Sequence, residues 1–375
     1  MNRSKLGMII LPIVFLCLVV GTQAWAAKRL TWNPGLSMVP VIAVDTKDNI
    51  YAVWYDEAPG TAEIYYKKST NGGTSWAATK RLTWTTSSSV EPAIAIDSND
   101  SVHIVFYDAS TGPYQILYKK STNGGTTWTS KRLTWTTTNS ESPDIALDSN
   151  DHIHLVWQEN ISGNSEIYHK KSPDGGATWS GAKQVTANIG YSYYPSIAID
   201  TSNNIHVAWR DDTSGFTEIH YMNSTDGGST WASKRLTWAK WFNYRPDIAI
   251  DSNDHIYVVW SDGLNIFGKK STNGGTTWTT RKLTWTAGPS SYPTIAINRG
   301  NNHIHLVWQE APQLSDNDIY HKISTNNGVS WTNTRLSWNA GESVYPAVAV
   351  DSSDKYHVVW EDNSPGNYEI FYANK

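Results

Sequence analysis

Cysteine is almost absent from this sequence of 375 residues. The single one, Cys17, lies in an apolar segment near the N-terminus. We therefore expect the rest of the chain to be stabilised by packing, without disulfides. Beyond residue 26 no apolar run reaches the length of a membrane span. The formal net charge is only −4, and Lys and Arg recur evenly instead of clustering. This distribution argues against a membrane-spanning protein and against nucleic acid as a partner.

The first 26 residues have the pattern of a secretory signal peptide. Arg3 and Lys5 precede an apolar stretch from Leu6 to Val20, and the segment ends in Ala24-Trp25-Ala26. A charged start, a short apolar run and an A-x-A motif predict cleavage after Ala26. We expect a secreted or periplasmic protein made of residues 27–375.

Phenylalanine is also scarce, with six residues against twenty Trp and twenty Tyr. Aromatic residues with a polar group favour β-structure, and they are equally suited to surfaces that bind sugars.

Four short segments recur in a fixed order along the chain. In one repeat or another they read PAIAID (Pro92–Asp97), HIHLVW (His152–Trp157), EIYYKKS (Glu63–Ser69) and KRLTW (Lys80–Trp84). Each is rich in β-branched or aromatic residues and is bounded by turn formers, which predicts four strands per repeat. The opening prolines lie about fifty residues apart, at Pro40, Pro92, Pro143, Pro195, Pro246, Pro293 and Pro346. Seven such units predict an all-β, seven-bladed β-propeller.

The two ends of the chain complement each other. The last repeat ends after EIFYANK (Glu369–Lys375) without its fourth strand, whereas an unattached KRLTW stands at Lys28–Trp32. We expect this N-terminal strand to complete the last blade and close the ring, which removes two exposed strand edges.

Between the third and fourth strands stands an eight-residue box with the pattern Ser-x-Asp/Asn-x-Gly-x-Thr/Ser-Trp. It occurs six times, at Ser69–Trp76, Ser121–Trp128, Ser172–Trp179, Ser224–Trp231, Ser271–Trp278 and Ser324–Trp331. Gly supplies a positive φ, the Asp or Asn side chain can accept backbone N–H groups two residues on, and Trp fills the space beneath the hairpin. Only Asp174 and Asp226 are acids at a position where four boxes have Asn, so we interpret the boxes as structural.

The box resembles the Asp-box, or bacterial neuraminidase repeat, of the sialidase superfamily, and the resemblance covers all of residues 27–375. It implies a propeller with the boxes on the face opposite the active site. The catalytic set of that superfamily, with three arginines, a Tyr–Glu pair, an acidic Asp and an Arg-Ile-Pro element, is not matched. The nearest element is Tyr244-Arg245-Pro246. Sialidase activity is therefore not expected from these motifs.

On the face away from the boxes, every second strand ends in an aromatic residue followed two positions later by an acid. These acids could accept hydrogen bonds within the scaffold or pair with basic residues of a neighbouring blade. Alternatively, each could form a polar pocket with a Trp that ends a KRLTW strand, and a carboxylate beside an indole suits sugar hydroxyls and C–H faces. The candidate ligand-binding residues are Asp56, Asp108, Glu159, Asp211, Asp262, Glu310 and Asp362, with Trp32, Trp84, Trp135, Trp238, Trp285 and Trp338.

Two other sets of polar residues are interpreted as structural. The DSND-type turns, as at Asp97–Asp100, are typical of tight hairpins and lack the pattern of a calcium loop. One His or Tyr per blade occupies the middle of each second strand, and ligands on separate blades do not suit a shared metal ion. These residues are Tyr51, His103, His154, His206, Tyr257, His305 and His357. We expect neither a metal nor another cofactor.

The repeat symmetry is broken at one place. The fourth strand of blade three has no Trp, and the loop after it holds Tyr191, Tyr193 and Tyr194. Arg210, Asp211, Tyr244 and Arg245 follow around blades four and five. If the protein has a single catalytic site, these four residues are its candidates.

The repeats are otherwise nearly interchangeable, which favours several equivalent weak sites over one asymmetric active site. We therefore expect a multivalent, lectin-like propeller that binds a glycan or another cell-surface ligand. One alternative is a sialidase-like glycoside hydrolase with its site at the blade four and five corner. Another is a platform for protein–protein interaction.

Overall fold

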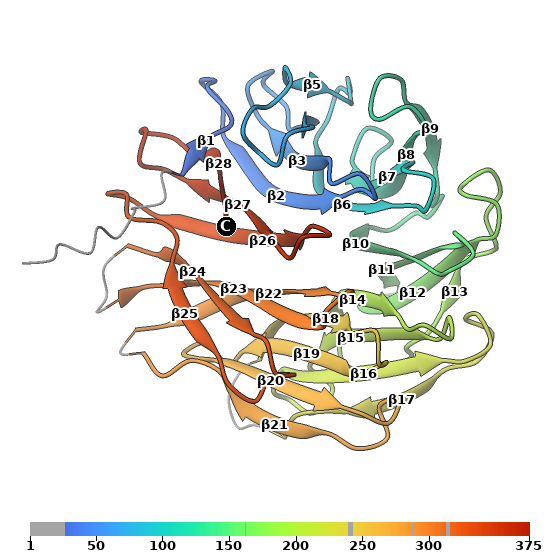
Figure 1. Ribbon diagram of the computed structural model, residues 1–375. Helices are drawn as coiled ribbons and strands as arrows, with labels where there is room; N and C mark the ends of the chain where they lie inside the picture. Colours follow the sequence, from blue (N-terminus) through green and yellow to red (C-terminus); the bar gives the residue numbers. More distant parts are fainter. Residues whose placement is uncertain (1–26, 162, 239–242, 287, 313–315) are drawn as a thin grey trace, which may run out of the picture.

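A computed structural model describes residues 27–161, 163–238, 243–286, 288–312 and 316–375, and these form a ring of seven four-stranded antiparallel sheets (Figure 1). The predicted all-β, seven-bladed propeller is confirmed. The predicted signal peptide and residues 239–242 lie outside the described residues. Among those described, no helix is long and apolar enough to cross a membrane.

Each blade is a meander whose first two strands lie nearest the axis. The innermost strands are β2 (Ser37–Val44), β6 (Ser89–Ile96), β10 (Ser140–Leu147), β14 (Ser192–Ile199), β18 (Tyr244–Ile250), β22 (Ser290–Asn298) and β26 (Ser343–Val350). The second strands are β3 (Ile50–Asp56), β7 (Val102–Asp108), β11 (Ile153–Ile161), β15 (Ile205–Asp211), β19 (Ile256–Ser261), β23 (His303–Glu310) and β27 (Tyr356–Asp362).

The third and fourth strands lie toward the rim of the disc. The third strands are β4 (Glu63–Ser69), β8 (Gln115–Ser121), β12 (Asn164–Ser172), β16 (Glu218–Ser224), β20 (Ile266–Ser271), β24 (Asp318–Ser324) and β28 (Glu369–Asn374). The outer strands are β5 (Lys80–Arg81), β9 (Thr129–Arg132), β13 (Lys183–Gln184), β17 (Ala232–Arg235), β21 (Thr279–Lys282), β25 (Thr332–Arg335) and β1 (Lys28–Arg29).

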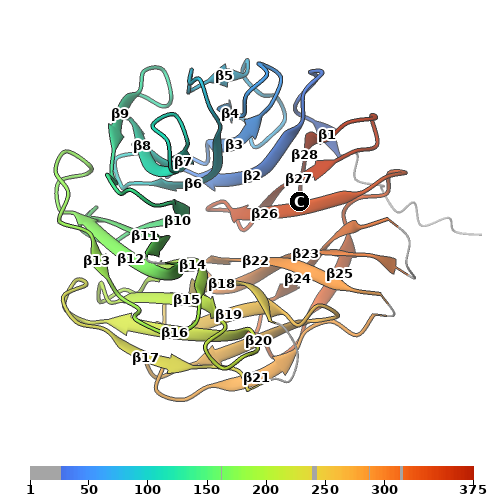
Figure 2. The ribbon, with the colours of Figure 1, turned by 180° about the vertical axis from the view of Figure 1, so that it is seen from behind.

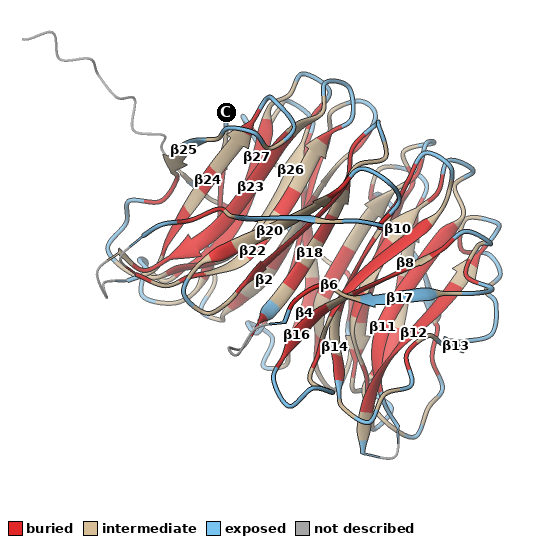
Figure 3. Ribbon diagram, turned by 90° about the horizontal axis from the view of Figure 1, so that it is seen from below, coloured by how far each residue is buried: buried red, intermediate tan, exposed pale blue. Residues whose placement is uncertain are grey.

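The hydrophobic core lies between the blades. Second strands such as β27 are buried along their whole length, because both faces of a blade pack against neighbouring sheets (Figure 3). In one core layer, Val53 of blade one packs with Ile104 and Phe106 of blade two. β-branched and aromatic residues suit this two-sided packing, which explains why the strand segments repeat so closely.

The ring closes through the N-terminal strand, as expected. β1 pairs with β28, with Lys28 opposite Tyr372 and Arg29 opposite Phe371. Leu30 N donates to Ile370 O at 2.7 Å, which extends the pairing by one residue. The first and last described strands lie side by side in both views (Figures 1 and 2). Blade seven therefore consists of strands from the two ends of the chain.

The boxes form turns between the third and fourth strands, and their structural role is confirmed. In the second box, Asn123 Oδ1 accepts from Thr127 N at 2.9 Å, and Ser121 Oγ accepts from Gly125 N at 2.8 Å. The Asn bond reaches four residues along the chain, where the sequence pattern suggested two, because Gly124 and Gly125 curl the loop at φ of 64° and 86°. Trp128 Nε1 donates to Gly125 O at 3.2 Å, and its indole packs against the preceding blade's Tyr66.

The DSND-type turns link consecutive blades. Asp97 Oδ1 accepts from two N–H groups of its own turn, while Ser98 N of that turn donates to Asp151 Oδ1 of the next blade at 2.9 Å. The same bond joins blade seven to blade one, from Ser352 N to Asp48 Oδ1. These carboxylates are engaged in holding the ring together.

Every innermost strand contains a β-bulge near its start. In β2 the register shifts between Met38 and Val41, and the same shift occurs in the other six blades. The residue before the proline has a φ of 40° to 52°, a region that costs energy for side chains other than glycine. We call these seven residues the channel ring: Val39, Glu91, Ser142, Tyr194, Arg245, Tyr292 and Tyr345.

Candidate functional site

Six of the seven candidate acids are almost completely buried. Their exposed fractions do not exceed 4% in Asp56, Asp108, Glu159, Asp211, Glu310 and Asp362. Asp56 is representative, because its Oδ2 accepts from Ser37 Oγ at 2.7 Å and from Asn33 Nδ2 at 2.6 Å. Its Oδ1 accepts from Ala58 N at 2.9 Å. At these positions the acids accept hydrogen bonds within the scaffold, the first of the two roles considered above, and so fix the loop between blades.

Asp262 differs from the other six acids. It is partly exposed, and its Oδ1 accepts from Leu264 N at 2.9 Å and from Asn265 N at 2.7 Å. Burial has an electrostatic effect on some of the others: it raises the pKa of Glu159 above the ordinary range of a glutamate. The binding role of the acids stays a prediction, and their geometry suits fixing the loops better than contact with a ligand.

The candidate tryptophans are far more exposed than the acids. We call the six residues that end the KRLTW strands the tryptophan ring: Trp32, Trp84, Trp135, Trp238, Trp285 and Trp338. Their exposed fractions lie between 64% and 71%. The tryptophans of the second strands, such as Trp54, are fully buried. These six large indoles forgo the stabilisation that burial would give, and their rings are accessible for contact with a ligand.

Each indole of the tryptophan ring is supported on one side. The guanidinium carbon of Arg81 lies 5.7 Å from the Trp84 ring centroid, and Arg81 Nη2 forms an ion pair with the buried Glu63 at 2.7 Å. Elsewhere the cation also comes from the following blade, as with Lys170, whose Nζ lies 5.6 Å from the Trp135 ring. Lys170 Nζ is fixed by a bond to Leu133 O at 2.6 Å. Cation–π contacts of this kind hold the indole in place while most of its surface stays open.

The predicted pairing of a tryptophan with a strand-end acid occurs in two cavities between blades. One, of about 300 Å³, is lined by Trp32, Asp56 and Tyr65. The other, of about 310 Å³, is lined by Trp238 and Asp262. These cavities are concave and combine an aromatic wall with polar groups, as saccharide sites require.

The His and Tyr residues in the middle of the second strands are packed, as expected. His103 Nδ1 bonds Tyr118 Oη at 2.6 Å, and its Nε2 bonds Asp97 Oδ2 at 3.2 Å. Burial lowers the pKa of His103, which favours the neutral ring. Within the part of the chain that the structure describes, no cluster of three or more His, Cys, Asp or Glu side chains is arranged to hold a metal.

The candidate catalytic corner consists of two separate groups. The guanidinium of Arg210 lies between the rings of Tyr193 and Tyr244, with its carbon 5.3 Å from each centroid. Asp211 is buried and accepts from Asn188 Nδ2 at 2.7 Å and from Ser192 Oγ at 3.1 Å. Asp211 therefore fixes the loop between blades in the same way as Asp56.

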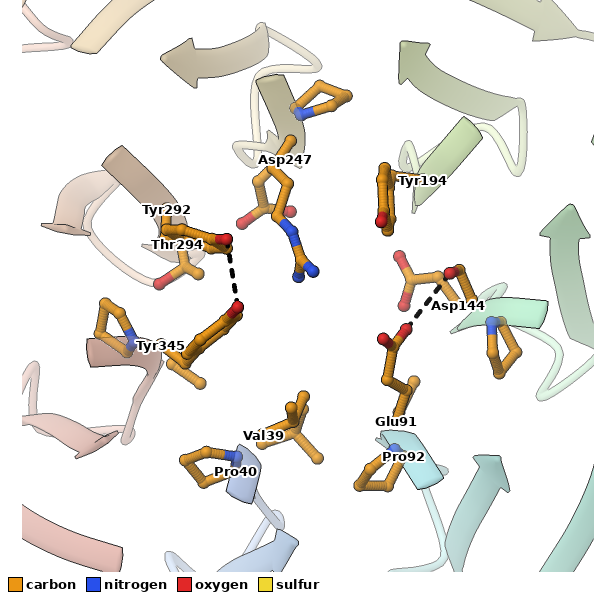
Figure 4. A pocket seen from close by; sticks show the side chains of 18 of the residues that line it. Val39, Pro40, Glu91, Pro92, Asp144, Tyr194, Asp247, Tyr292, Thr294 and Tyr345 are labelled. Carbon is orange, nitrogen blue, oxygen red and sulfur yellow. Dashed lines mark hydrogen bonds between the residues drawn. The ribbon is translucent and has the colours of Figure 1, made fainter. Parts of the chain in front are cut away.

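Arg245 belongs to the mouth of the central channel. Its guanidinium carbon lies 4.7 Å, 4.8 Å and 5.4 Å from the ring centroids of Tyr194, Tyr292 and Tyr345. Tyr292 Oη and Tyr345 Oη are 3.1 Å apart. Figure 4 shows the labelled side chains converging from different blades, with these two phenols turned toward each other. One cation among three tyrosines has the chemistry to pair with a carboxylate or to stack on the face of a sugar.

The channel mouth is a cavity of about 260 Å³ lined by the channel ring and by the residues that follow it. On the side toward blades two and three, Ser142 Oγ donates to Glu91 Oε2 at 3.2 Å (Figure 4). Deeper in the channel, burial raises the pKa of Asp144 to about 7. The cavity therefore combines one cation and three tyrosines with the carboxyl groups of Glu91, Asp144 and Asp247.

Non-repeating side chains on the second strands form hydrogen bonds with the backbone of the channel ring. The bulged N–H groups of the channel ring need acceptors, and at three of the seven positions a side chain on the second strand of the preceding blade supplies one. Tyr194 N donates to Gln158 Oε1 at 3.0 Å, and Val39 N donates to Glu361 Oε1 at 2.6 Å. Burial raises the pKa of Glu361 to about 8, although the Val39 N–H and the Arg245 charge oppose this shift.

The sequence interpretation did not single out the channel ring, except for Tyr194 and Arg245. It treated the repeats as interchangeable, but at this position they are Val, Glu, Ser, Tyr, Arg, Tyr and Tyr. Alignment of the repeats on their prolines would have shown that the residue before the proline is of five types in seven repeats. Variation at one position of a near-identical repeat marks a place where sevenfold symmetry is broken.

The seven blades, the six boxes and the asymmetric channel mouth together define an Asp-box propeller. Residues 21–189 match the family model described as BNR repeat-like domain. This match agrees with the resemblance of the boxes to the Asp-box, or bacterial neuraminidase repeat. A comparison with curated proteins finds no significant match.

Solved structures of the same fold include a polysaccharide lyase and several sialidases. A polysaccharide lyase of family PL25, an ulvan lyase bound to -[GlcA(1-4)Rha3S]-, is similar with a TM-score of 0.68 and 12% identity, over 93% of this chain and 94% of that one. The leech intramolecular trans-sialidase has a TM-score of 0.51 and 12% identity, over 90% and 68%. NanB sialidase from Streptococcus pneumoniae has a TM-score of 0.52 and 13% identity, over 94% and 70%. At these identities the likeness establishes the fold alone.

Proposed function

We propose that this protein is an exported, multivalent carbohydrate-binding propeller that uses the tryptophan ring to contact its ligand. The observation that carries the proposal is the exposure of six equivalent indoles, each 64% to 71% accessible. Buried tryptophans in the same blades show that the fold can cover an indole where stability requires it. The exposed ones are therefore suited to contact with something outside the chain.

The chemistry of these positions suits a sugar. The open face of an indole stacks on the C–H face of a pyranose, and nearby polar groups bond its hydroxyls. Beside Trp32, the cavity also presents Asn33 and Thr79, and beside Trp238 it presents Asn243 and Thr280. The fixed Arg and Lys behind the rings reduce the entropy lost when a ligand binds.

A monosaccharide on a single indole has a small contact area, so each site is weak. An affinity in the millimolar-to-micromolar range corresponds to about −4 to −8 kcal/mol. Several such sites on one rigid disc bind a polysaccharide or a glycan-covered surface much more tightly than any one of them.

A glycan array with the fluorescently labelled chain of residues 27–375 tests this proposal. We expect polysaccharides or clustered glycans to be retained. Titration with the best ligand should change the intrinsic fluorescence, because the exposed indoles are the ones covered. Trp135→Ala should reduce the change and Trp135→Phe should retain most of it, since a phenyl ring still stacks. A fluorescence change that is equal in all three proteins would contradict the assignment.

A second candidate function is supported by the asymmetry of the channel mouth. Arg245 among three tyrosines, opposite Glu91, offers a single site for an acidic sugar, with titratable groups within the same cavity. The similar structures are those of an ulvan lyase and of sialidases, so a glycosidase or lyase reaction is the form this function would take. Turnover of an acidic polysaccharide that is lost in Arg245→Gln but kept in Trp135→Ala would establish it.

A further inference from the structure

A glycine interrupts a set of aromatic residues on the third strands. In six blades the fourth residue of the segment equivalent to EIYYKKS is Tyr or His. These residues are Tyr66, Tyr118, His169, Tyr221, His321 and Tyr372. Blade five has Gly268 there, in β20. Its φ lies outside the left-handed region, so the backbone conformation does not require a glycine.

In the neighbouring blades this aromatic ring fills the space under the next box. The Tyr221 ring lies edge-on to Trp278, with 5.0 Å between centroids. A Cβ added at Gly275 of the same box would lie 2.5 Å from the Tyr221 ring. The rings of Tyr66, Tyr118, His169 and Tyr372 approach their box glycines in the same way.

Blade five leaves this space open. The box that follows has Gly328, and the atoms nearest to a Cβ built there are 3.8 Å away or more. A cavity of about 390 Å³ lies between blades five and six, with Trp331 and Tyr257 among its walls. Its floor is apolar and includes Val259, Leu283 and Ile295. An apolar cavity of only about 150 Å³ already binds benzene, so this space is ample for an aromatic ring.

The rim of the cavity is cationic. Lys269, Lys270 and Arg281 line it, and Arg281 takes the place of the lysine found in five other outer strands. Lys270 Nζ donates to Asn327 O at 3.3 Å, and Arg281 donates to Gly328 O and Val329 O. Among the described residues no carboxylate forms an ion pair with any of the three. The charge at the rim is thus not neutralised by an ion pair.

We infer that this cavity, here called the Gly268 cavity, is a binding site for an aromatic acid, meaning a planar aromatic ring that carries a carboxylate. The ring takes the place of the missing tyrosine, with its edge toward Trp331 and its face toward Tyr257. The carboxylate lies at the rim, where the guanidinium of Arg281 offers two parallel N–H donors. A saccharide fits the site poorly, because the apolar floor would leave its hydroxyls without partners.

The inference is independent of the tryptophan ring and can be tested separately. Calorimetry or ligand-observed NMR with 4-hydroxybenzoate should give one saturable site on the chain of residues 27–375. Gly268→Tyr restores the side chain of the neighbouring blades, and the closest atom to the added Cβ is the flexible Leu283 Cδ1 at 3.0 Å. This variant should fold and should bind 4-hydroxybenzoate at least tenfold more weakly. Trp135→Ala should bind it as the unmodified protein does.

A second variant separates the charge from the ring. Arg281→Gln should weaken binding of 4-hydroxybenzoate severalfold and leave binding of phenol unchanged, because only the former has a carboxylate. Cyclohexanecarboxylate should bind more weakly than benzoate, since it lacks the aromatic edge and face contacts. The inference is overturned if the unmodified protein shows no saturable binding, or if Gly268→Tyr binds as well as it does. It is also overturned if Arg281→Gln affects phenol and 4-hydroxybenzoate equally.

Discussion

Lys28, the second residue of the described chain, lies opposite Tyr372 in the outer half of blade seven. The pairing brings together residues at the two ends of the sequence, and the side chains reinforce it. Arg29 Nη2 forms an ion pair with the fully buried Glu369 at 2.6 Å. Blade seven therefore depends on a strand from the far end of the chain for its outer edge.

Deletion of residues 28–32 should expose the edge of β28 and leave Glu369 buried without its arginine. We expect a lower melting temperature, a broader transition and a tendency to aggregate, because unpaired strand edges associate. Differential scanning calorimetry with light scattering measures both effects. An unchanged melting curve would refute the contribution of this strand to closure.

The third box allows a test of the structural role of its acid. Asp174 Oδ1 accepts from Thr178 N at 2.7 Å, and Oδ2 accepts from Thr178 Oγ1 at 2.6 Å. These bonds lower the pKa of Asp174 to about 2. In the second box Asn123 makes the equivalent contacts, with its amide donating to Thr127 Oγ1 at 2.8 Å. Asp174→Asn should therefore change the stability and any ligand binding very little.

Trp179 of the same box provides the contrast. Its indole lies edge-on to Tyr118 of the preceding blade, and its Nε1 donates to Gly176 O at 3.2 Å. Trp179→Ala should lower the free energy of unfolding by about 3 kcal/mol, the lower end for a large aromatic because this one is partly exposed. Urea unfolding of both variants measures the difference. Loss of ligand binding in a stable Asp174→Asn protein would show that the box is part of a binding site.

The buried Glu361 gives the stability a specific pH dependence. Its pKa is raised to about 8 in the folded protein, mainly by burial, from about 4.3 in an unfolded chain. The folded state therefore holds the proton more tightly than the unfolded state. The stabilisation that this group contributes is complete below pH 4.3 and is lost as the pH rises through 8.

Glu361→Gln mimics the protonated form at every pH. We expect the variant and the unmodified protein to have similar stabilities near pH 4, and the variant to be the more stable one at pH 9. Unfolding curves across this range measure the difference, and Glu57→Gln, at an exposed position, is the control. A constant difference between pH 4 and pH 9 would show that Glu361 has no raised pKa.

The repeat predicted the fold because the four strands of each blade have nearly the same sequences. Closure of the ring was equally predictable, since the spare Lys28–Trp32 strand matched the strand missing from the last repeat. The burial of Asp56 could not be predicted from the sequence, because its partners Ser37 and Asn33 belong to other segments and meet it only when the sheet forms. The role of Arg245 at the channel mouth also depends on tyrosines from three other blades.

The central claim is that several equivalent tryptophans bind carbohydrate, and the number of sites per chain tests it most directly. Isothermal titration calorimetry with the oligosaccharide selected on the array should give a stoichiometry well above one. Trp135→Ala should lower that number by about one and leave the affinity of the remaining sites unchanged, and Trp135→Phe should retain it. A stoichiometry of one that is insensitive to Trp135→Ala and abolished by Arg245→Gln would contradict the claim and place the binding site at the channel mouth.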